Sequence, residues 1–320
     1  MRYSRIVATG HYLPERVLTN DELERMVETS DAWIRARTGI RQRHIAAPTE
    51  SVAGMGERAS RMALETAGLA AEDIDLIVMG TTTPDQVFPN SAVIMQERLG
   101  VAGIPAFSLE AACSGFIYAL AVADNFIRAG SAGRVLVVGA EKMSSIVDWN
   151  DRSTCVLFGD GAGAVILEHT QTPGILDTRL HADGRYKDLL QFPSGIASSK
   201  ARIAEDALQM KGSEVFRVAV AKLGEEIVET LARHDLDGNA VDWLVPHQAN
   251  ARIISAIARR LDLPMERVVL TVGEHGNTSS ASVPLALDLA IRDGRIQRGD
   301  LLLLEAFGGG FTWGSALVRY

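Results

Sequence analysis

Short runs of aliphatic residues, each closed by glycine or a turn residue, constrain the fold of this chain more than any other feature of its sequence. Runs of about four to eight such residues are typical of strands buried on both faces of a sheet. Between them, apolar residues recur at helical spacing, so strands alternate with helices, which predicts an α/β fold whose parallel or mixed sheet is covered on both faces. The expected strands are Asp75–Gly80, Arg134–Gly139, Gly163–Glu168, Asp242–Pro246, Asp300–Ala306 and Trp313–Tyr320.

The order of these elements repeats along the chain. Each half has an aliphatic strand, a helix, a second strand that ends in small residues, and a terminal strand rich in Gly and Ala. We therefore expect two similar halves, residues 1–172 and 173–320, that meet in the turn-rich segment around 171–174 and pack as one unit. A site built from both halves would lie at their interface.

The composition disfavours several classes of protein. A net charge of −8 over 320 residues argues against nucleic acid or an anionic membrane as the main partner and favours a small-molecule substrate. No stretch approaches the roughly 20 apolar residues that span a bilayer, and the first residues lack the apolar core of an export signal. Two cysteines are too few for a disulfide scaffold, so we expect free thiols in a reducing cytoplasm.

Cys113 is a candidate nucleophile. It stands in the segment EAACSGF, residues 110–116, where an apolar run gives way to a helical pattern. Small neighbours let the backbone turn sharply, and a thiol at a helix N-terminus lies at the positive end of the dipole, which favours the thiolate. Taken alone, a cysteine of this kind is more often a buried structural residue, which is also the role we expect for Cys155.

His247 and Asn277 are candidate polar groups in the second half. His247 follows the strand Asp242–Pro246 and precedes a helix, and in α/β folds functional side chains lie beyond the carboxyl ends of strands. Asn277 lies in the loop segment HGNTSS, residues 275–280. Each residue alone is also consistent with a structural histidine or with an asparagine in a turn or helix cap. We interpret the neighbouring His275 as structural.

Three consecutive glycines follow the most aliphatic strand, in the segment FGGGF at 307–311. A phosphate-binding loop should open a helix, whereas residues 312–320 have a strand pattern, so a nucleotide cradle is not expected. The glycines still permit close backbone approach, and their N–H groups could line an oxyanion hole. The sequence has no HExxH motif, no cysteine pair with zinc spacing, no P-loop and no GxSxG motif, and we expect no metal.

Together these segments resemble the condensing enzymes of the thiolase superfamily and, most closely, the β-ketoacyl-acyl carrier protein synthase III family. The resemblance runs nearly end to end, and the Cys, His and Asn motifs occur in the family's order. The segments that carry it are TSDAWI (29–34), RTGI (37–40), AAC (111–113), DRSTC (151–155), FGDGAG (158–163), PHQAN (246–250), GNTS (276–279) and FGGGF (307–311).

The resemblance implies a five-layered αβαβα thiolase-like fold with two duplicated halves, assembled as a homodimer. It implies that Cys113 takes an acyl group from an acyl-coenzyme A such as acetyl-CoA, and that His247 and Asn277 promote decarboxylation of malonyl-acyl carrier protein. The resulting carbanion attacks the Cys113 thioester to give 3-ketoacyl-acyl carrier protein, which initiates type II fatty acid synthesis, and the coenzyme A thioester is a substrate rather than a cofactor. The N–H groups of Cys113 and Gly310 are candidates for the oxyanion hole of the acyl thioester.

Further positions match the family's binding residues. Trp33 and Arg152 match positions that flank the adenine of coenzyme A, and Phe88 matches a loop that reaches the partner subunit's acyl pocket. Glu110 and Ser114 replace alanines that are common beside the family's cysteine, which leaves the acyl preference open. The positions matched along the pantetheine channel are Arg37, Gly212, Phe216 and Asn250. Those predicted to dock the acidic carrier protein are Gln248, Arg252, Arg259 and Arg260. For the three arginines, the alternative is a helix face that is simply exposed to solvent.

Three alternatives stay open at this point. A specialised ketosynthase or acyltransferase of secondary metabolism would use the same thioester with another acceptor. A cysteine hydrolase would need a base to orient water, and no acidic residue is adjacent to His247 or Asn277 in the sequence. A non-catalytic binding protein would have no need for Cys113, His247 and Asn277 together. Primer length and branching cannot be read from the sequence.

Overall fold

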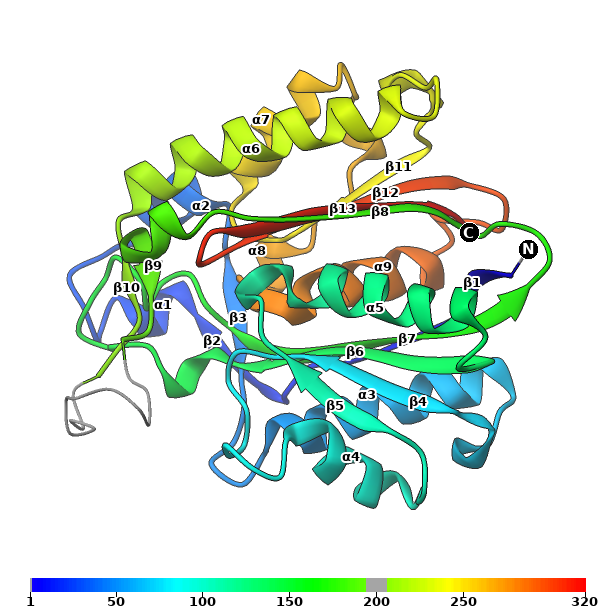
Figure 1. Ribbon diagram of the computed structural model, residues 1–320. Coiled ribbons are helices and arrows are strands. Elements are labelled where there is room, and N and C mark those ends of the chain that lie inside the picture. Colours follow the sequence, from blue (N-terminus) through cyan, green and yellow to red (C-terminus); the bar gives the residue numbers. More distant parts are fainter. Residues whose placement is uncertain (1, 194–205) are drawn as a thin grey trace.

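The helices and strands form five layers, in which two sheets alternate with three layers of helices (Figure 1). The computed structural model describes residues 2–193 and 206–320. The expected αβαβα arrangement is confirmed. The first sheet has the strand order β1 (Tyr3–Tyr12), β7 (Asp160–Thr170), β6 (Arg134–Lys142), β4 (Leu76–Gly80) and β5 (Ala106–Leu109), and the second has the order β11 (Trp243–Pro246), β12 (Leu301–Gly308), β13 (Thr312–Arg319) and β8 (Ile175–Ala182).

The two sheets repeat one topology. In the first, β4 pairs parallel with β6, β6 antiparallel with β7, and β7 antiparallel with β1. In the second, β11, β12, β13 and β8 follow each other with the same directions. The expected correspondence of β4, β6 and β7 with β11, β12 and β13 is therefore found in the strand order, and the chain passes from one sheet to the other at residues 171–174.

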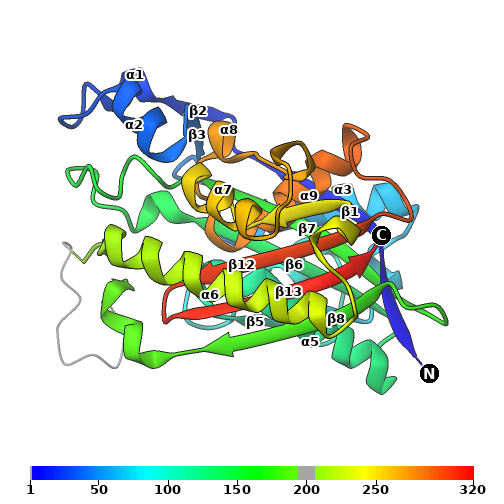
Figure 2. The same ribbon diagram turned by 90° about the horizontal axis from the view of Figure 1, so that it is seen from above.

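Helices cover both faces of each sheet. Helices α3 (Val52–Ala67) and α4 (Ser91–Leu99) lie on the outer face of the first sheet, and α5 (Gly115–Ala129) and α9 (Ser282–Arg292) lie between the sheets (Figure 1). Figure 2 shows α6 (Gly212–Ala232) running along the outer face of the second sheet, with α7 (Ala251–Arg260) packed beside it. Within the described residues, no helix is long and apolar enough to cross a bilayer.

Side chains of the buried strands alternate between two hydrophobic clusters. On β12, Leu302 and Leu304 join the cluster between the sheets, whereas Leu301 and Leu303 join the cluster beneath α6 and α7. Burial on both faces explains why this strand reads as a continuous aliphatic run.

Several elements were not predicted, because polar residues interrupt their apolar pattern. Strand β1 contains Ser4 and Thr9, which are buried because their hydroxyls donate to Asp124 of α5 and Asp288 of α9, each at 2.6 Å. Strand β8 has few buried residues.

The smaller elements are α1 (Asn20–Leu23), α2 (Asp31–Thr38), α8 (Val272–His275), the strand pairs β2 (Arg16–Thr19) with β3 (Gln42–Ile45) and β9 (Leu190–Gln191) with β10 (Gln209–Met210), and the 3-10 turns η1 (Ala71–Asp73), η2 (Ala112–Ser114), η3 (Met143–Ser145), η4 (Gly184–Leu189), η5 (Gly238–Ala240), η6 (Met265–Arg267) and η7 (Ser279–Ala281).

Candidate active site

A cavity of about 520 Å³ brings together the three predicted catalytic side chains, Cys113, His247 and Asn277. Cys113 follows β5, and His247 follows β11. Asn277 precedes η7 and is held against the segment before β7, where its N–H donates to the Leu157 carbonyl at 2.8 Å. The first half of the chain thus supplies the thiol, and the second half supplies the histidine and the amide.

Cys113 lies in the turn η2 at the N-terminal end of α5. The preceding residue, Ala112, has a φ of +46°, in the left-handed region, so the chain turns sharply just before the thiol. Gly308 of β12 packs against this turn, and a Cβ atom there would lie 2.6 Å from the Cys113 nitrogen. A glycine at 308 therefore allows the second sheet to approach the nucleophile's backbone.

The Cys113 thiol is 7% exposed, and its pKa is raised to about 12, mainly because the thiol is buried. The carboxylates of Glu141 and Glu110 act in the same direction, whereas a hydrogen bond with the Ser279 side chain lowers the pKa. The expectation that the helix terminus favours a thiolate is not met in the resting protein, because loss of hydration outweighs it. The thiol is protonated at neutral pH and must lose its proton during the reaction.

His247 is held as a neutral imidazole. Burial lowers its pKa to about 3, and its backbone N–H donates to the Glu305 carbonyl at 2.8 Å. Its Nδ1 lies 2.6 Å from Oγ of Ser282, the first residue of α9. This Oγ also accepts the N–H of Gln248 at 3.3 Å. When the hydroxyl donates its hydrogen to Nδ1, the imidazole carries its proton on Nε2, and this is the tautomer that we assign.

The amide of Asn277 has a defined orientation. Its Oδ1 accepts the backbone N–H of Ser279 at 2.9 Å. This bond is the turn interaction expected for an asparagine in a loop, and it occupies the oxygen end of the amide. The Nδ2 end is therefore the one left to donate to a substrate.

The triple glycine contributes to the cavity at Gly309, which is among its lining residues, whereas Gly310 is not. Gly310 has a φ of +133°, a conformation that side chains other than glycine rarely adopt. The following Thr312 donates from Oγ1 to the Ala111 carbonyl at 2.9 Å and so ties the start of β13 to the Cys113 turn. This geometry favours the N–H of Gly309 over that of Gly310 as the partner of Cys113 in an oxyanion hole.

Trp33 lies at the cavity between two predicted binding residues. The guanidinium carbon of Arg37 is 5.7 Å from its ring centroid, and that of Arg152 is 5.4 Å from it. Trp33 and Arg37 line the cavity, while Arg152 is exposed and donates to the Glu28 carbonyl at 2.8 Å. Trp33 and Arg152, the two residues predicted at the adenine, are thus neighbours, and Arg37 of the predicted pantetheine channel lies beside the same indole.

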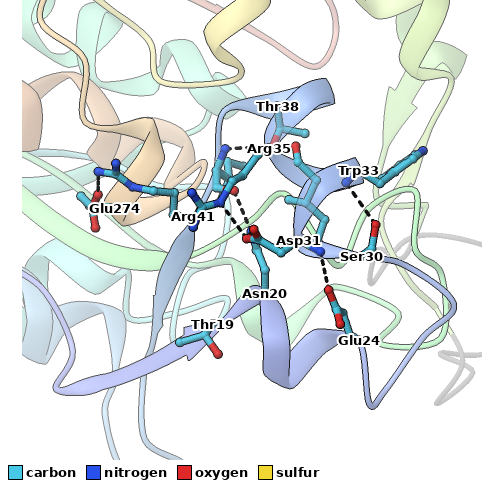
Figure 3. A network of polar contacts seen from close by, with 12 residues as sticks. Thr19, Asn20, Glu24, Ser30, Asp31, Trp33, Arg35, Thr38, Arg41 and Glu274 are labelled. Carbon is cyan, nitrogen blue, oxygen red and sulfur yellow. Dashed lines mark hydrogen bonds and ion pairs between the residues drawn. The ribbon is translucent and has the colours of Figure 1, made fainter.

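Polar contacts fix the helix that carries Trp33, α2 (Figure 3). Ser30 caps this helix by accepting the N–H of Trp33 at 3.1 Å. The Asp31 carboxylate accepts hydrogen bonds from Arg35 Nε and Asn20 Nδ2, each at 2.8 Å, and the Asp31 N–H donates to the Glu24 carboxylate. The first turn of α2 is therefore anchored on both sides, which holds the indole at the cavity.

The remaining channel residues also line the cavity. Gly212 begins α6, and Phe216 follows one turn later. Asn250 caps α7, since its Oδ1 accepts the N–H of Arg252 at 2.8 Å and its Nδ2 donates to the Arg37 carbonyl at 3.1 Å. Asn250 thus joins α7 to α2 at the cavity.

The predicted docking arginines lie exposed on α7. Arg252 and Arg259 line a shallow depression together with Arg35, and the Arg252 guanidinium carbon is 5.5 Å from the Phe216 ring centroid at the cavity. The stem of Arg260 packs against Gly224 of α6. A basic surface therefore adjoins the cavity.

Gln248 does not belong to that surface, and its predicted contact with a carrier protein is wrong. The side chain is buried, and its Nε2 donates to the carbonyls of Pro246 and Val269 at 2.8 and 3.0 Å. Its Oε1 accepts the N–H groups of Thr271 and Val272. With its polar atoms engaged inside the protein, Gln248 holds the loop before α8.

Phe88 is 82% exposed, and its neighbour Val87 is 64% exposed. Neither residue lines the cavity. A large apolar side chain at a loop tip is consistent with insertion into another molecule, so the predicted contact with a partner subunit stays a prediction.

Sequence reasoning missed four polar residues near the cavity: Ser279, Ser282, Glu141 and Glu305. Glu305 lines the cavity, and within the described part of the chain neither of its side-chain oxygens has a hydrogen-bond partner. Burial raises its pKa to about 8. A lone carboxylate at the end of an aliphatic strand was the available signal for both Glu141 and Glu305.

Known proteins resemble this chain along its whole length. The chain matches the family description "3-Oxoacyl-[acyl-carrier-protein (ACP)] synthase III" over residues 107–184 and its C-terminal counterpart over residues 231–320. It is 59% identical over 322 residues to the beta-ketoacyl-[acyl-carrier-protein] synthase III of Thioalkalivibrio sulfidiphilus, covering 100% of both chains. It is 61% identical over 320 residues to that of Xanthomonas campestris pv. campestris, covering 99% of this chain and 98% of the relative.

A solved structure gives the same result. The crystal structure of 3-oxoacyl-[acyl-carrier-protein] synthase III from Aquifex aeolicus VF5 superposes with a TM-score of 0.94 at 47% identity, covering 99% of this chain and 100% of the other. The similarity therefore extends over the whole fold and not only over the segments around the cavity.

Proposed function

Since the chain belongs to the 3-oxoacyl-[acyl-carrier-protein] synthase III family, we propose that it condenses an acyl-CoA primer, such as acetyl-CoA, with malonyl-acyl carrier protein. The product is a 3-ketoacyl-acyl carrier protein, and the reaction initiates type II fatty acid synthesis. The observation that carries this proposal is the meeting of a buried thiol, a neutral imidazole and an oriented amide in one cavity.

The first half-reaction is acyl transfer. Cys113 Sγ attacks the thioester carbon of acyl-CoA, the carbon–sulfur bond to coenzyme A breaks, and an acyl-Cys113 thioester remains. A thiol is both a good nucleophile and a good leaving group, so one difficult substitution becomes two easier ones. Negative charge builds on the thioester oxygen, and the backbone N–H groups of Cys113 and Gly309 are the proposed donors to it.

The second half-reaction is decarboxylative condensation. Loss of carbon dioxide from the malonyl group builds negative charge on its thioester oxygen, which receives hydrogen bonds from His247 Nε2 and Asn277 Nδ2. One such donor contributes roughly 3 kcal/mol in other enzymes. A histidine whose pKa is about 3 donates this bond as the neutral form throughout the physiological range. The carbanion then attacks the acyl carbon, and Cys113 leaves.

Substrate binding uses the residues around the cavity mouth. We assign the adenine of coenzyme A to Trp33 with Arg37 and Arg152, since a planar base stacks on an indole and on guanidinium groups. The pantetheine arm passes Gly212, Phe216 and Asn250, which line the cavity. No cofactor besides the thioester substrate, and no metal, takes part in this scheme.

The carrier protein docks on the surface formed by Arg252, Arg259 and Arg260, because an acidic partner is attracted to a basic face. Reversing the charge of Arg259 should weaken use of malonyl-acyl carrier protein several-fold while acylation by acyl-CoA is unchanged. Equal losses in both reactions would contradict the assignment. We further propose a cytoplasmic homodimer in which Phe88 reaches the acyl pocket of the other subunit, since Phe88 is otherwise an exposed apolar side chain.

The test is a reconstituted condensation with acetyl-CoA and malonyl-acyl carrier protein labelled in its free carboxyl group. Release of labelled carbon dioxide together with a 3-ketoacyl-carrier product supports the proposal, and variants His247→Ala and Asn277→Ala should lose the release. Free acetate in place of the ketoacyl product would instead identify a thioester hydrolase.

A further inference from the structure

The hydroxyl of Ser279 lies between the nucleophile, Cys113, and a buried carboxyl group, that of Glu141. Cys113 in η2 and Ser279 in η7 lie on turns that pack against each other, which brings the Ser279 side chain within hydrogen-bonding reach of the thiol, and the Ser279 Oγ donates to Oε1 of Glu141 at 3.2 Å. Cys113 and Ser279 line the cavity, whereas Glu141 lies behind them near the end of β6 and is 0% exposed. The condensation mechanism above uses neither Ser279 nor Glu141.

Glu141 is surrounded by donors. Its Oε2 accepts the hydroxyl of Thr83 at 2.6 Å, and Thr82 donates its N–H at 3.1 Å to both oxygens. The Ser280 hydroxyl donates to Oε1 at 2.8 Å. These bonds favour the carboxylate, while burial disfavours it, and the pKa of Glu141 is raised to about 7. The group can therefore gain or lose a proton near neutral pH.

The direction of the Ser279 hydroxyl defines a path for the proton. A hydroxyl has one hydrogen. In the resting thiol form Ser279 donates that hydrogen to Glu141, and its oxygen can accept the thiol proton; after the transfer the hydroxyl donates to the thiolate, which is the bond that lowers the pKa of Cys113. We propose that Ser279 passes the Cys113 proton to Glu141 when the acyl group is loaded and returns it when Cys113 leaves. This inference rests on the proposed function, because it assigns the proton of the same acyl-transfer reaction.

The proton and electrons balance over the two half-reactions. During loading, the Sγ–H bond breaks as the Sγ–carbon bond forms; Ser279 takes that proton and gives its own to Glu141. Coenzyme A leaves as a thiolate and is protonated by solvent. During condensation the acyl carbon–Sγ bond breaks, and Glu141 returns its proton through Ser279 to the departing thiolate.

The other titratable groups near Cys113 fit this role less well. Burial holds His247 neutral, with a pKa of about 3, so it is a weak base. Glu305 lines the cavity but has no hydrogen-bonded link to the thiol among the described residues, and Glu110 instead accepts the N–H of Ala112 at 2.9 Å. Glu141 is the carboxyl group connected to Cys113 through Ser279.

The experiment measures loading of Cys113 by acetyl-CoA between pH 5.5 and 9, with rapid quenching and intact-protein mass spectrometry. Ser279→Ala removes the bridging hydroxyl but keeps the backbone N–H that orients Asn277. The matched control is Ser280→Ala, because Ser280 also donates to Glu141 but makes its other bond to the Gly80 carbonyl, away from the thiol.

We expect the wild-type loading rate to rise with a midpoint near pH 7 and then to level off. Ser279→Ala should slow loading at neutral pH by about 10²-fold, the usual contribution of proton transfer, and its rate should keep rising to pH 9. Glu141→Gln should likewise lose the midpoint, and it provides a second variant. Ser280→Ala keeps the bridging hydroxyl, so its loading rate should still level off, at a plateau within about threefold of wild type; its midpoint should move to higher pH, because the lost bond lowers the pKa of Glu141.

A second readout separates this path from general damage to the site. Carbon dioxide release from malonyl-acyl carrier protein in a Cys113→Ala background should be unchanged by Ser279→Ala, because His247 and Asn277 remain in place. A wild-type loading profile in Ser279→Ala would overturn the proton path while the proposed condensation stands. Failure of the wild type to load from acetyl-CoA would overturn both.

Discussion

Removal of the Ser282 hydroxyl should slow decarboxylation selectively. In the structure this hydroxyl lies 2.6 Å from Nδ1 of His247 and has no contact with the thiol. Ser282→Ala leaves Nδ1 buried without its partner, and the imidazole then loses the restraint that keeps its proton on Nε2. The donor to the developing oxyanion is thereby weakened, while Cys113 and Gly309 are untouched.

The size of the effect follows from the bond that is lost. A buried polar atom left without a partner costs about 1–3 kcal/mol, and each 1.36 kcal/mol is a factor of ten in rate. Decarboxylation should therefore slow by about 5- to 150-fold. Complete loss of the Nε2 donor would set an upper limit of about 10²- to 10³-fold.

The assay compares labelled carbon dioxide release from malonyl-acyl carrier protein with single-turnover loading of Cys113 in the same variant. A matched control is Ser4→Ala, because Ser4 is also buried and its hydroxyl also makes a 2.6 Å bond, to Asp124 of α5. Both variants should lose stability, but only Ser282→Ala should slow carbon dioxide release. Unchanged release, or an equal loss of loading, would refute the assigned tautomer.

Three further predictions concern packing, binding and pH. Gly308→Ala places a Cβ atom 2.6 Å from the Cys113 nitrogen, so it should lower the free energy of unfolding by about 1–3 kcal/mol and slow loading about 10²-fold. The control is Gly184→Ala, whose added Cβ atom meets open space and should have neither effect. Trp33→Ala should raise KM for acetyl-CoA about tenfold by removing the stacking surface, with carbon dioxide release unchanged; an unchanged KM would contradict the adenine assignment. Burial raises the pKa of Glu305 from 4.5 to about 8, so the folded state keeps a proton that the unfolded chain releases, and wild-type stability should fall between these pH values. A glutamine at position 305 does not titrate, so the free energy of unfolding of Glu305→Gln, measured by denaturation, should rise relative to that of the wild type between pH 5 and pH 8. The same difference at both pH values would contradict the raised pKa.

The sequence predicted those parts of the fold that depend on local apolar pattern. Strand β12 is recognisable because Leu301–Leu304 are buried on both faces. Strand β1 was missed because its buried Ser4 and Thr9 are stabilised by carboxylates of helices more than a hundred residues away. Such partners are set by tertiary packing and leave no periodic signal in the strand itself.

The candidate site divides in the same way. Each of Cys113, His247 and Asn277 alone was also consistent with a structural role, and they were predicted because their motifs occur together in the order of the family. The state of the Cys113 thiol was not, because its pKa depends on burial by residues of both halves. Gln248 was misplaced because only the folded loop shows that its side chain turns inward.

The central claim is that Cys113 carries the acyl group, and intact-protein mass spectrometry after incubation with acetyl-CoA tests it most directly. The account predicts that the wild type gains the mass of one acetyl group and that Cys113→Ala gains none. A wild type without an adduct, or an adduct that persists in Cys113→Ala, would contradict it.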